Sequence, residues 1–388
     1  MRLAELVAAL SLGIDLGFGQ PMEHVLRQCI IALRLAERIG LDESERVVVY
    51  YTALLVNVGC HSDAHEQAKW FGDDIALKST KYSHERGVRA AAATMRLVGS
   101  GNPPLHRFRV GVEFAVSGRH DVDGSALTRH AELAGGLAEQ LGLPDAVRAA
   151  IAASYEQWNG KGWPGRLRGD AVPIGSRLAQ LAEFVEVAHR LGGVAGAETL
   201  ARRRGGSQFD PALSELLCAD SEAILGGLDS SHTWEAVIAA EPVLGVRLTG
   251  RQLDAALLAV ANFVDLKSPY SLGHARAVAD LAAEAGAALG LTEDAVRTLR
   301  RAGLVHDLGR LGVSNSIWDK PGPLGAGEWE RVRLQPYLTD RMLRQSTALA
   351  PLGGIAVQHR ERLDGSGYPA GLSGTAISRA ARILGAAD

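Results

Sequence analysis

The chain contains an internal repeat, and this repeat constrains its fold more than any other feature of the sequence. Residues 40–59 align without a gap on residues 290–309, and the same shift of 250 places His24 on His274. A second block, WNGKGWP at 158–164, matches LDGSGYP at 363–369 with a shift of 205. A repeat unit of this length indicates a duplicated domain rather than a solenoid.

The two shifts differ, so the first copy carries an insertion. Because 250 minus 205 is 45, about 45 extra residues lie between Gly59 and His130. The boundary between the copies is predicted near residues 240–250. This gives two tandem domains, residues 1–245 (the first repeat) and residues 246–388 (the second repeat), as expected for a chain of 388 residues.

Each repeat is predicted to be all-α, because apolar residues recur with the period of a helix and rarely alternate. His274, Val278, Leu281 and Ala285 define one helix face. Thr292 is the predicted N-cap of the next helix. Similar faces include His306 with residues 296–303, His359 with residues 352–355, and Asp388 with residues 377–384.

Composition excludes several classes of protein. The net charge is −3 and 47% of the residues are hydrophobic, which argues against a polyanion-binding surface and against disorder. The most basic cluster, Arg202–Arg204, is interpreted as a solvated loop. Three scattered cysteines, no apolar run of membrane-spanning length and no signal peptide predict a cytoplasmic protein without a membrane contact.

The polar residues on the predicted apolar faces point to a metal site. A single buried histidine is usually a satisfied core residue, but here His274, His306 with Asp307, His359 and Asp388 all face inward. Buried imidazoles and carboxylates are costly unless a cation or hydrogen bonds satisfy them. Helical bundles build sites for Mn, Fe, Zn or Mg from such facing side chains.

Two motifs in the second repeat resemble a known family. The segment 304–313 reads LVHDLGRLGV and resembles the HD signature of the HD phosphohydrolases, and DGSGYP at 364–369 resembles the GYP signature of the HD-GYP branch. The resemblance implies two tandem HD-type helical bundles and metal-dependent hydrolysis of cyclic di-GMP or a related phosphodiester. It covers residues from about 250 to the end.

The resemblance also implies roles for individual residues. Arg310 stands at a lysine position of the family, Gln335 at a histidine ligand position, and Arg360 at the second histidine of a His-His pair. One divalent ion, Mn, Fe or similar, is therefore expected, and a second is doubtful, although Gln335 could offer its carbonyl oxygen. The implied metal ligands are His274, His306, Asp307, His359 and Asp388, the catalytic residues are Asp307 and Arg310, and the substrate-binding residues are Arg310, Arg360, Gly367 and Tyr368.

The partners stay open at this point. The substrate is a cyclic dinucleotide or another phosphoester, a protein partner at the GYP loop and a homodimer are alternatives, and Tyr368 and Pro369 could equally pin the loop by packing. A non-catalytic nucleotide sensor or scaffold is the alternative function, because two ligand positions are substituted.

The first repeat is predicted to be a pseudo-domain, since Val56-Asn57, Ser154-Tyr155 and Glu183 replace ligands of the family. The second repeat is expected to be C-terminally truncated, and the sequence contains no recognisable nucleic-acid-binding module.

Overall fold

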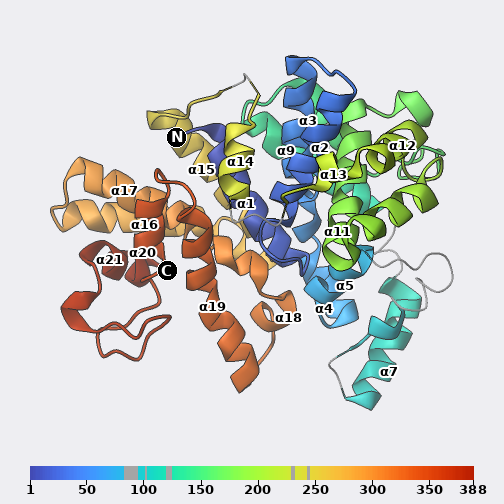
Figure 1. Cartoon of the computed structure of the whole chain (residues 1–388). Coiled ribbons are helices and arrows are strands. Elements are labelled where there is room, and N and C mark those ends of the chain that lie inside the picture. Colours follow the sequence, from blue (N-terminus) through green and yellow to red (C-terminus); the bar gives the residue numbers. More distant parts are fainter. Residues whose placement is uncertain (83–94, 101–102, 119–124, 229–231, 243–244) are drawn as a thin grey trace.

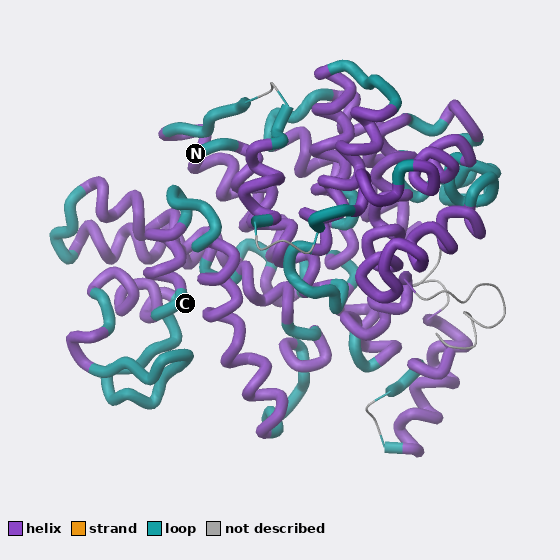
Figure 2. The backbone as a smooth tube through the Cα atoms, in the orientation of Figure 1, coloured by secondary structure: helices purple, strands orange, loops and turns teal. Residues whose placement is uncertain are grey.

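The described part of the protein consists mainly of helices. The computed structural model describes residues 1–82, 95–100, 103–118, 125–228, 232–242 and 245–388. These residues form helices and connecting loops, and no strand occurs among them (Figures 1 and 2). The predicted all-α class is confirmed.

The helices fall into three groups along the chain. The first repeat contains α1 (Leu3–Gly17), α2 (His24–Arg38), α3 (Glu43–Leu55), η1 (Val58–His61), α9 (Ser125–Gln140), α10 (Asp145–Ala152), η4 (Gly169–Ala171), α11 (Ile174–Arg204), α12 (Pro211–Ala219), α13 (Ser221–Leu225) and α14 (Thr233–Ala239). Between η1 and α9 lie α4 (Ala64–Phe71), α5 (Asp74–Ser79), η2 (Thr80–Tyr82), α7 (Pro104–Glu113) and η3 (Phe114–Gly118). The second repeat contains α15 (Gly250–Asp265), η5 (Pro269–Ser271), α16 (His274–Ala288), α17 (Glu293–Val305), η6 (Leu308–Gly312), α18 (Asn315–Trp318), α19 (Ala326–Leu343), α20 (Ala350–Ala356), η7 (Gly374–Ala376) and α21 (Arg379–Ala387).

Helices with residue numbers that differ by 250 begin in the same way. α2 and α16 start at His24 and His274, and α3 and α17 have side-chain N-caps. The Asp42 carboxylate accepts a hydrogen bond from the Glu45 amide, and the Thr292 hydroxyl accepts one from the Ala295 amide. These caps satisfy amide groups that the first helical turn leaves free. The prediction that Thr292 caps its helix is confirmed.

One apolar core runs through both repeats. Helix α1 packs against α2 and α3 of its own repeat and also against η6 and α19 of the second repeat. Gly13 allows this approach, because a Cβ there would come 2.9 Å from Leu311 Cδ1 and 3.1 Å from Met342 Sδ. The first helix of the chain therefore supports η6, the segment that directly follows His306 and Asp307.

The insertion joins the second repeat through a buried ionic network. Asp74 of α5 accepts hydrogen bonds from the Ser314 hydroxyl at 2.8 Å and the Asn315 amide at 2.9 Å. Its other oxygen lies 3.1 Å from Lys78 Nζ and 3.3 Å from Lys267 Nζ. Burial lowers the pKa of Lys267 to about 8, while Lys267 and Lys78 hold the pKa of Asp74 well below its usual range against the opposing effect of burial. The negative charge of the buried Asp74 is thus compensated by one lysine of the insertion, Lys78, and one of the second repeat, Lys267.

Two expectations from the sequence are wrong. Leu281 does not face inward: 51% of it is exposed, and it lines a groove of about 490 Å³ between α16 and α21. Arg202–Arg204 is not a solvated loop but the last turn of α11, in which the buried Arg204 guanidinium lies 4.9 Å from the Phe184 ring centroid. The Phe184 ring and a hydrogen bond from Nη1 to Gln208 Oε1 at 3.2 Å compensate the burial of that guanidinium.

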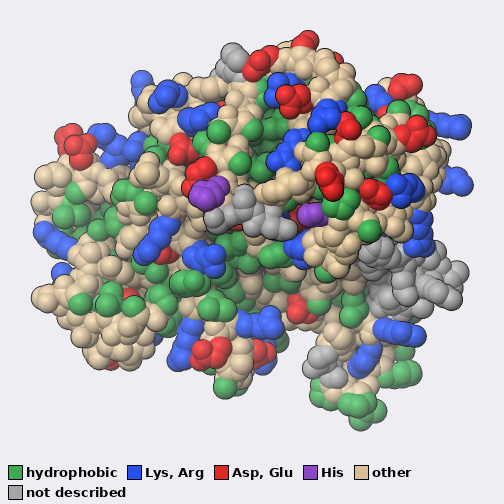
Figure 3. Space-filling view, viewed as in Figure 1, with side chains coloured by type: hydrophobic (Ala, Val, Ile, Leu, Met, Phe, Trp, Pro, Cys, Tyr) green, Lys and Arg blue, Asp and Glu red, His purple; other side chains and the backbone are tan. Residues whose placement is uncertain are grey.

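The surface mixes both signs of charge. In the face shown in Figure 3, Lys and Arg side chains alternate with Asp and Glu rather than forming a patch of one sign. Within the described residues, no helix has the length and apolar character needed to cross a bilayer.

Candidate metal centre

Three polar side chains converge in the second repeat from the ends of three helices. His274 is the first residue of α16, His306 follows α17 and Asp388 follows α21. His274 Nε2 lies 3.0 Å and His306 Nε2 lies 3.4 Å from Asp388 Oδ1. Among the described residues, a group of three His, Cys, Asp or Glu ligand atoms within 4.8 Å of one another occurs only here.

Asp307 adds a second carboxylate to this cluster. Its Oδ2 lies 3.9 Å from His274 Nε2 and 3.2 Å from Arg310 Nη1, and its Oδ1 lies 3.9 Å from His306 Nε2. Burial opposes ionisation, but His306 and Arg310 lower the pKa of Asp307 to about 2. The carboxylate is therefore ionised at neutral pH.

His359 completes the set from the turn after α20. Its Nε2 lies 3.8 Å from Asp388 Oδ2, and its ring centroid lies 5.2 Å from that of His306. Burial, His306 and Arg360 lower the pKa of His359 to about 4, so its imidazole is neutral. The structure thus brings all five predicted ligands together. We refer to His274, His306, Asp307, His359 and Asp388 as the second-repeat cluster.

Two of these histidines present a free nitrogen to the cluster. His306 Nδ1 lies 2.7 Å from the Gly303 carbonyl oxygen, and His359 Nδ1 lies 2.5 Å from the Ala356 carbonyl oxygen. These contacts place the proton on Nδ1. Both Nε2 atoms are buried and have no hydrogen-bond partner. Metal-binding histidines commonly donate one ring N–H to a backbone carbonyl oxygen and bind the metal through the other nitrogen.

The charge of the cluster also fits a cation. Although burial opposes it, His274, His306 and Arg360 hold the pKa of Asp388 well below its usual range. Despite burial, Asp307 and Asp388 raise the pKa of His306. Ionised carboxylates beside unpartnered imidazole nitrogens form a donor set that suits Mn, Fe or Zn. The residues present therefore fit a divalent metal ion.

The two substituted positions behave differently from ligands. Gln335 turns its amide nitrogen inward and donates to the His306 carbonyl at 2.8 Å and to Asp307 Oδ1 at 3.0 Å. The expectation that Gln335 offers a carbonyl oxygen is wrong, because both neighbouring atoms are acceptors. Arg360 places Nη2 2.8 Å from Asp388 Oδ2, so a fixed positive charge occupies this corner.

The backbone around the HD motif is held by residues that the sequence did not single out. The Thr339 hydroxyl donates to the His306 carbonyl at 3.0 Å and accepts from the Gly309 amide at 2.8 Å. A Cβ at Gly309 would come 2.0 Å from the Gln335 carbonyl oxygen. The glycine is therefore needed for η6 to lie directly on α19.

The GYP loop (residues 364–372) is held by a carboxylate that the sequence also did not single out. Glu361 accepts hydrogen bonds from the Ala370 amide at 2.6 Å and the Leu372 amide at 2.9 Å. Glu156 of the first repeat likewise accepts hydrogen bonds from the backbone amides of residues 165–167. Glu156 and Glu361 are 205 residues apart, so the internal repeat is the sequence signal that could have revealed both carboxylates.

Gly367 is fixed by its own loop. A Cβ there would come 2.4 Å from the Arg362 amide nitrogen and 2.5 Å from the Arg360 carbonyl oxygen. The glycine thus serves the packing of the GYP loop.

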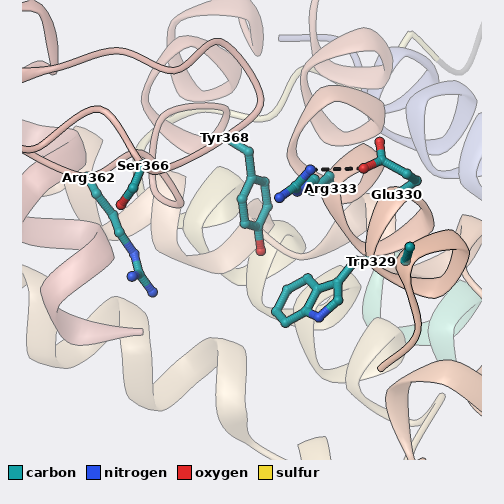
Figure 4. A pocket seen from close by; sticks show the side chains of 7 residues that line it. Trp329, Glu330, Arg333, Arg362, Ser366 and Tyr368 are labelled. Carbon is teal, nitrogen blue, oxygen red and sulfur yellow. Dashed lines mark hydrogen bonds and ion pairs between the residues drawn. The ribbon is translucent and has the colours of Figure 1, made fainter. Parts of the chain in front are cut away.

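A cavity of about 450 Å³ opens beside this loop. Figure 4 shows the Tyr368 side chain between Arg362 and Ser366 on one side and Arg333 and Trp329 of α19 on the other. Burial raises the pKa of Tyr368, and the Tyr368 amide donates a hydrogen bond at 3.2 Å to the carbonyl of Arg360, whose side chain pairs with Asp388 of the second-repeat cluster. A cleft lined by arginines and aromatic rings suits a ligand with phosphates and flat bases.

Known proteins resemble this chain in sequence and in fold. The HD domain family matches residues 259–388. The 3'3'-cGAMP-specific phosphodiesterase 3 of Vibrio cholerae serotype O1 is 31% identical over 395 residues, covering 100% of this chain and 85% of that protein. The chain belongs to the HD-GYP family of metal-dependent phosphodiesterases. It is therefore a metal-dependent phosphodiesterase.

Other members of the HD-GYP family match in sequence or in fold. The crystal structure of a cyclic GMP-AMP phosphodiesterase of Vibrio cholerae (V-cGAP3) superimposes with a TM-score of 0.69 and 27% identity, covering 100% of this chain and 87% of that one. The cyclic di-GMP phosphodiesterase response regulator RpfG of Xanthomonas campestris is 41% identical over 113 residues, which cover 29% of each protein.

Proposed function

We propose that the second repeat hydrolyses a phosphodiester bond of a 3'-linked cyclic dinucleotide. The observation that carries this proposal is the convergence of His274, His306 and Asp388, with ligand atoms within 4.8 Å of one another. The relative that spans the whole chain is named for 3'3'-cGAMP and a shorter match for cyclic di-GMP, so these two are the first substrates to test.

We propose one divalent ion, Mn or Fe, held by His274, His306, Asp307 and Asp388, with His359 at its edge. Such an ion supplies a Lewis acid that polarises the phosphodiester and makes water more acidic. A second ion is disfavoured, because Arg360 and the Gln335 amide supply positive charge and hydrogen-bond donors at the two substituted positions.

The chain's own residues have distinct proposed roles. Asp307 anchors the ion, and Arg310 stabilises charge on the phosphate oxygens, while the Trp318 ring, 4.6 Å away, holds its guanidinium in place. The Arg360 side chain is 36% exposed and would contact the phosphate while it pairs with Asp388. Gly367 acts indirectly, because it lets the GYP loop pack and so places Tyr368.

The cavity beside the GYP loop supplies the rest of the proposed substrate site. Arg333 and Arg362 would neutralise the phosphate away from the reacting one, and Tyr368 and Trp329 would stack on a base. The exposed GYP loop is also the surface proposed for a protein partner or a second copy. Three free thiols support the cytoplasm as the proposed compartment.

The alternative is a non-catalytic sensor or scaffold, and the ion pair between Arg360 and Asp388 favours it. The test is turnover of 3'3'-cGAMP and cyclic di-GMP by the Mn-loaded chain, followed by chromatography of the linear products. We expect hydrolysis of at least one substrate, and loss of it in His306→Ala but not in Asp294→Ala, a surface control. No hydrolysis of either, together with retained nucleotide binding, would support the alternative.

A further inference from the structure

The first repeat contains a cluster at the positions that correspond to the metal ligands. Asn57 corresponds to Asp307, Glu183 to Asp388 and His24 to His274. All three side chains are buried, and Asn57 Nδ2 donates to Glu183 Oε1 at 2.7 Å. We refer to His24, Asn57 and Glu183 as the first-repeat cluster.

A lysine of the insertion reaches into this cluster. Lys81, on η2, places its Nζ 2.6 Å from Glu183 Oε1 and 2.8 Å from Asn57 Oδ1. The ammonium thus contacts the two side chains that correspond to Asp307 and Asp388. Lys81 is 25% exposed, and Glu183 is almost completely buried.

Aromatic rings surround the same ammonium. Lys81 Nζ lies 5.6 to 5.9 Å from the ring centroids of Phe18, Tyr82, Tyr155 and Phe184. Ring faces attract cations at such distances, and more strongly where water is excluded. The surroundings of Lys81 are therefore those of a cation site.

His24 has the orientation of a metal-binding histidine. Its Nδ1 lies 2.5 Å from Glu186 Oε2, and Arg27 fixes Glu186 at 2.7 Å. Its Nε2 is buried and has no hydrogen-bond partner. A carboxylate behind an imidazole with a free Nε2 is the usual outer-shell arrangement of metal-binding histidines.

We propose that the ammonium of Lys81 takes the place of a metal ion in the first-repeat cluster. A buried glutamate needs a cation, and here the insertion supplies it from within the chain. The first repeat thereby keeps the charge balance of an HD-type site and is closed to divalent metals. The fold of the first repeat therefore does not depend on a metal ion. The charge balance of the second-repeat cluster does.

The direct test is a metal titration of the full-length chain with and without Lys81. Lys81→Ala should bind one more Mn²⁺ per chain than the parent in equilibrium dialysis, because His24, Asn57 and Glu183 are then free to bind it. Lys81→Arg, which keeps the positive charge, should bind no more than the parent. Adding Glu183→Gln to Lys81→Ala should abolish the gain. Equal Mn²⁺ content of Lys81→Ala and the parent would overturn the proposal.

A second test measures the charge compensation itself and does not require a metal. In metal-free buffer, Lys81→Met should lower the melting temperature by about 5 °C, because it leaves the buried Glu183 carboxylate without a cation. The double variant Lys81→Met/Glu183→Gln should recover most of that loss. Additive effects of the two substitutions would show that Lys81 does not balance Glu183. Both tests count changes relative to the parent, so neither depends on what the second repeat hydrolyses.

Discussion

At the scale of single residues, the backbone determines which histidine nitrogens are free to bind a metal. His306 and His359 each direct Nδ1 to a carbonyl oxygen three residues earlier, and each leaves Nε2 unpartnered inside the second-repeat cluster. The Nε2 of His359 has no proton to lose before it binds a cation, whereas Asp307 and Asp388 raise the pKa of His306 and favour its protonated form until a cation displaces that proton. The backbone therefore fixes which nitrogen of each ring faces the cluster.

The substituted corner of the cluster leads to a prediction about metal number. The double variant Gln335→His/Arg360→His removes a fixed positive charge and adds two imidazoles. It should bind a second Mn²⁺ and hydrolyse the cyclic dinucleotide at least about 10-fold faster, since a second ion clamps the leaving oxygen. Metal analysis and turnover are measured on the same sample. A second ion without faster hydrolysis would point to another substrate or a regulatory role.

A buried carboxyl outside both clusters predicts the pH dependence of stability. Asp15 accepts a hydrogen bond from the Val25 amide, and burial raises its pKa to about 7, against the opposing charges of His24 and Arg27. A carboxyl with a raised folded pKa contributes stability that is complete below about pH 4 and is lost as the pH rises through 7. Asp15→Asn should remove this loss of stability at high pH, because an amide does not ionise.

The measurement is the melting temperature of Asp15→Asn and the parent from pH 4 to pH 8. Near pH 4 the two proteins should have the same melting temperature. At pH 8 the variant should melt at a higher temperature, because its free energy of unfolding is larger by on the order of 4 kcal/mol. Asp294→Asn, a substitution on the surface, should run parallel to the parent. A constant difference between Asp15→Asn and the parent across this range would rule out titration of Asp15.

At the scale of elements, α5 connects the insertion to the second repeat. Asp74 is fully buried and receives two hydrogen bonds and two lysine contacts there. Asp74→Ala leaves Lys267 buried without its carboxylate and should lower the free energy of unfolding by about 3 kcal/mol. Urea unfolding followed by circular dichroism measures this. The control Asp294→Ala should change it by less than about 0.5 kcal/mol, and an equally small effect of Asp74→Ala would contradict the role of the network.

The sequence predicts elements best where local rules and burial agree. Periodicity predicted the helices, and Thr292 was identified as a cap, because both depend on neighbouring residues. Leu281 follows the same periodicity yet lies at the rim of a groove, and only tertiary packing decides this.

The same contrast holds for the candidate site. The five residues of the second-repeat cluster stand out in sequence as polar groups on apolar faces, whereas their metal-binding role stays a prediction. Lys81, Asp74 and Trp329 were not predicted, because Lys81 and Asp74 lie in an insertion without a counterpart, and Trp329 reaches its cavity only through the fold. The direction of the Gln335 amide depends on two acceptors that are distant in sequence.

At the scale of the whole molecule, the two repeats share a core rather than standing side by side as independent units. Helix α1 packs on η6 of the second repeat, and α15 packs on α9 of the first repeat, so the first helix of each repeat contacts the other repeat. The boundary near residue 245 stays a prediction, and helices from both sides of it contribute to one core.

This shared core predicts that the two repeats associate when they are made as separate chains. Fragments 1–245 and 246–388, produced together with different affinity tags, should co-purify through the contact of α1 with η6. Gly13→Phe should reduce the recovered complex at least about 10-fold, because the new ring would overlap Leu311 and Met342. Independent elution of unmodified fragments would contradict a shared core.

The central claim is that the second-repeat cluster holds one divalent metal ion, and elemental analysis of the purified full-length chain tests it most directly. Protein prepared without chelator and dialysed against Mn²⁺ should contain one ion per chain, and Asp307→Ala should contain almost none, because an ionised ligand is lost. The surface variant Asp294→Ala should retain the ion. An unchanged metal content in Asp307→Ala, or no bound metal in the parent, would contradict the account.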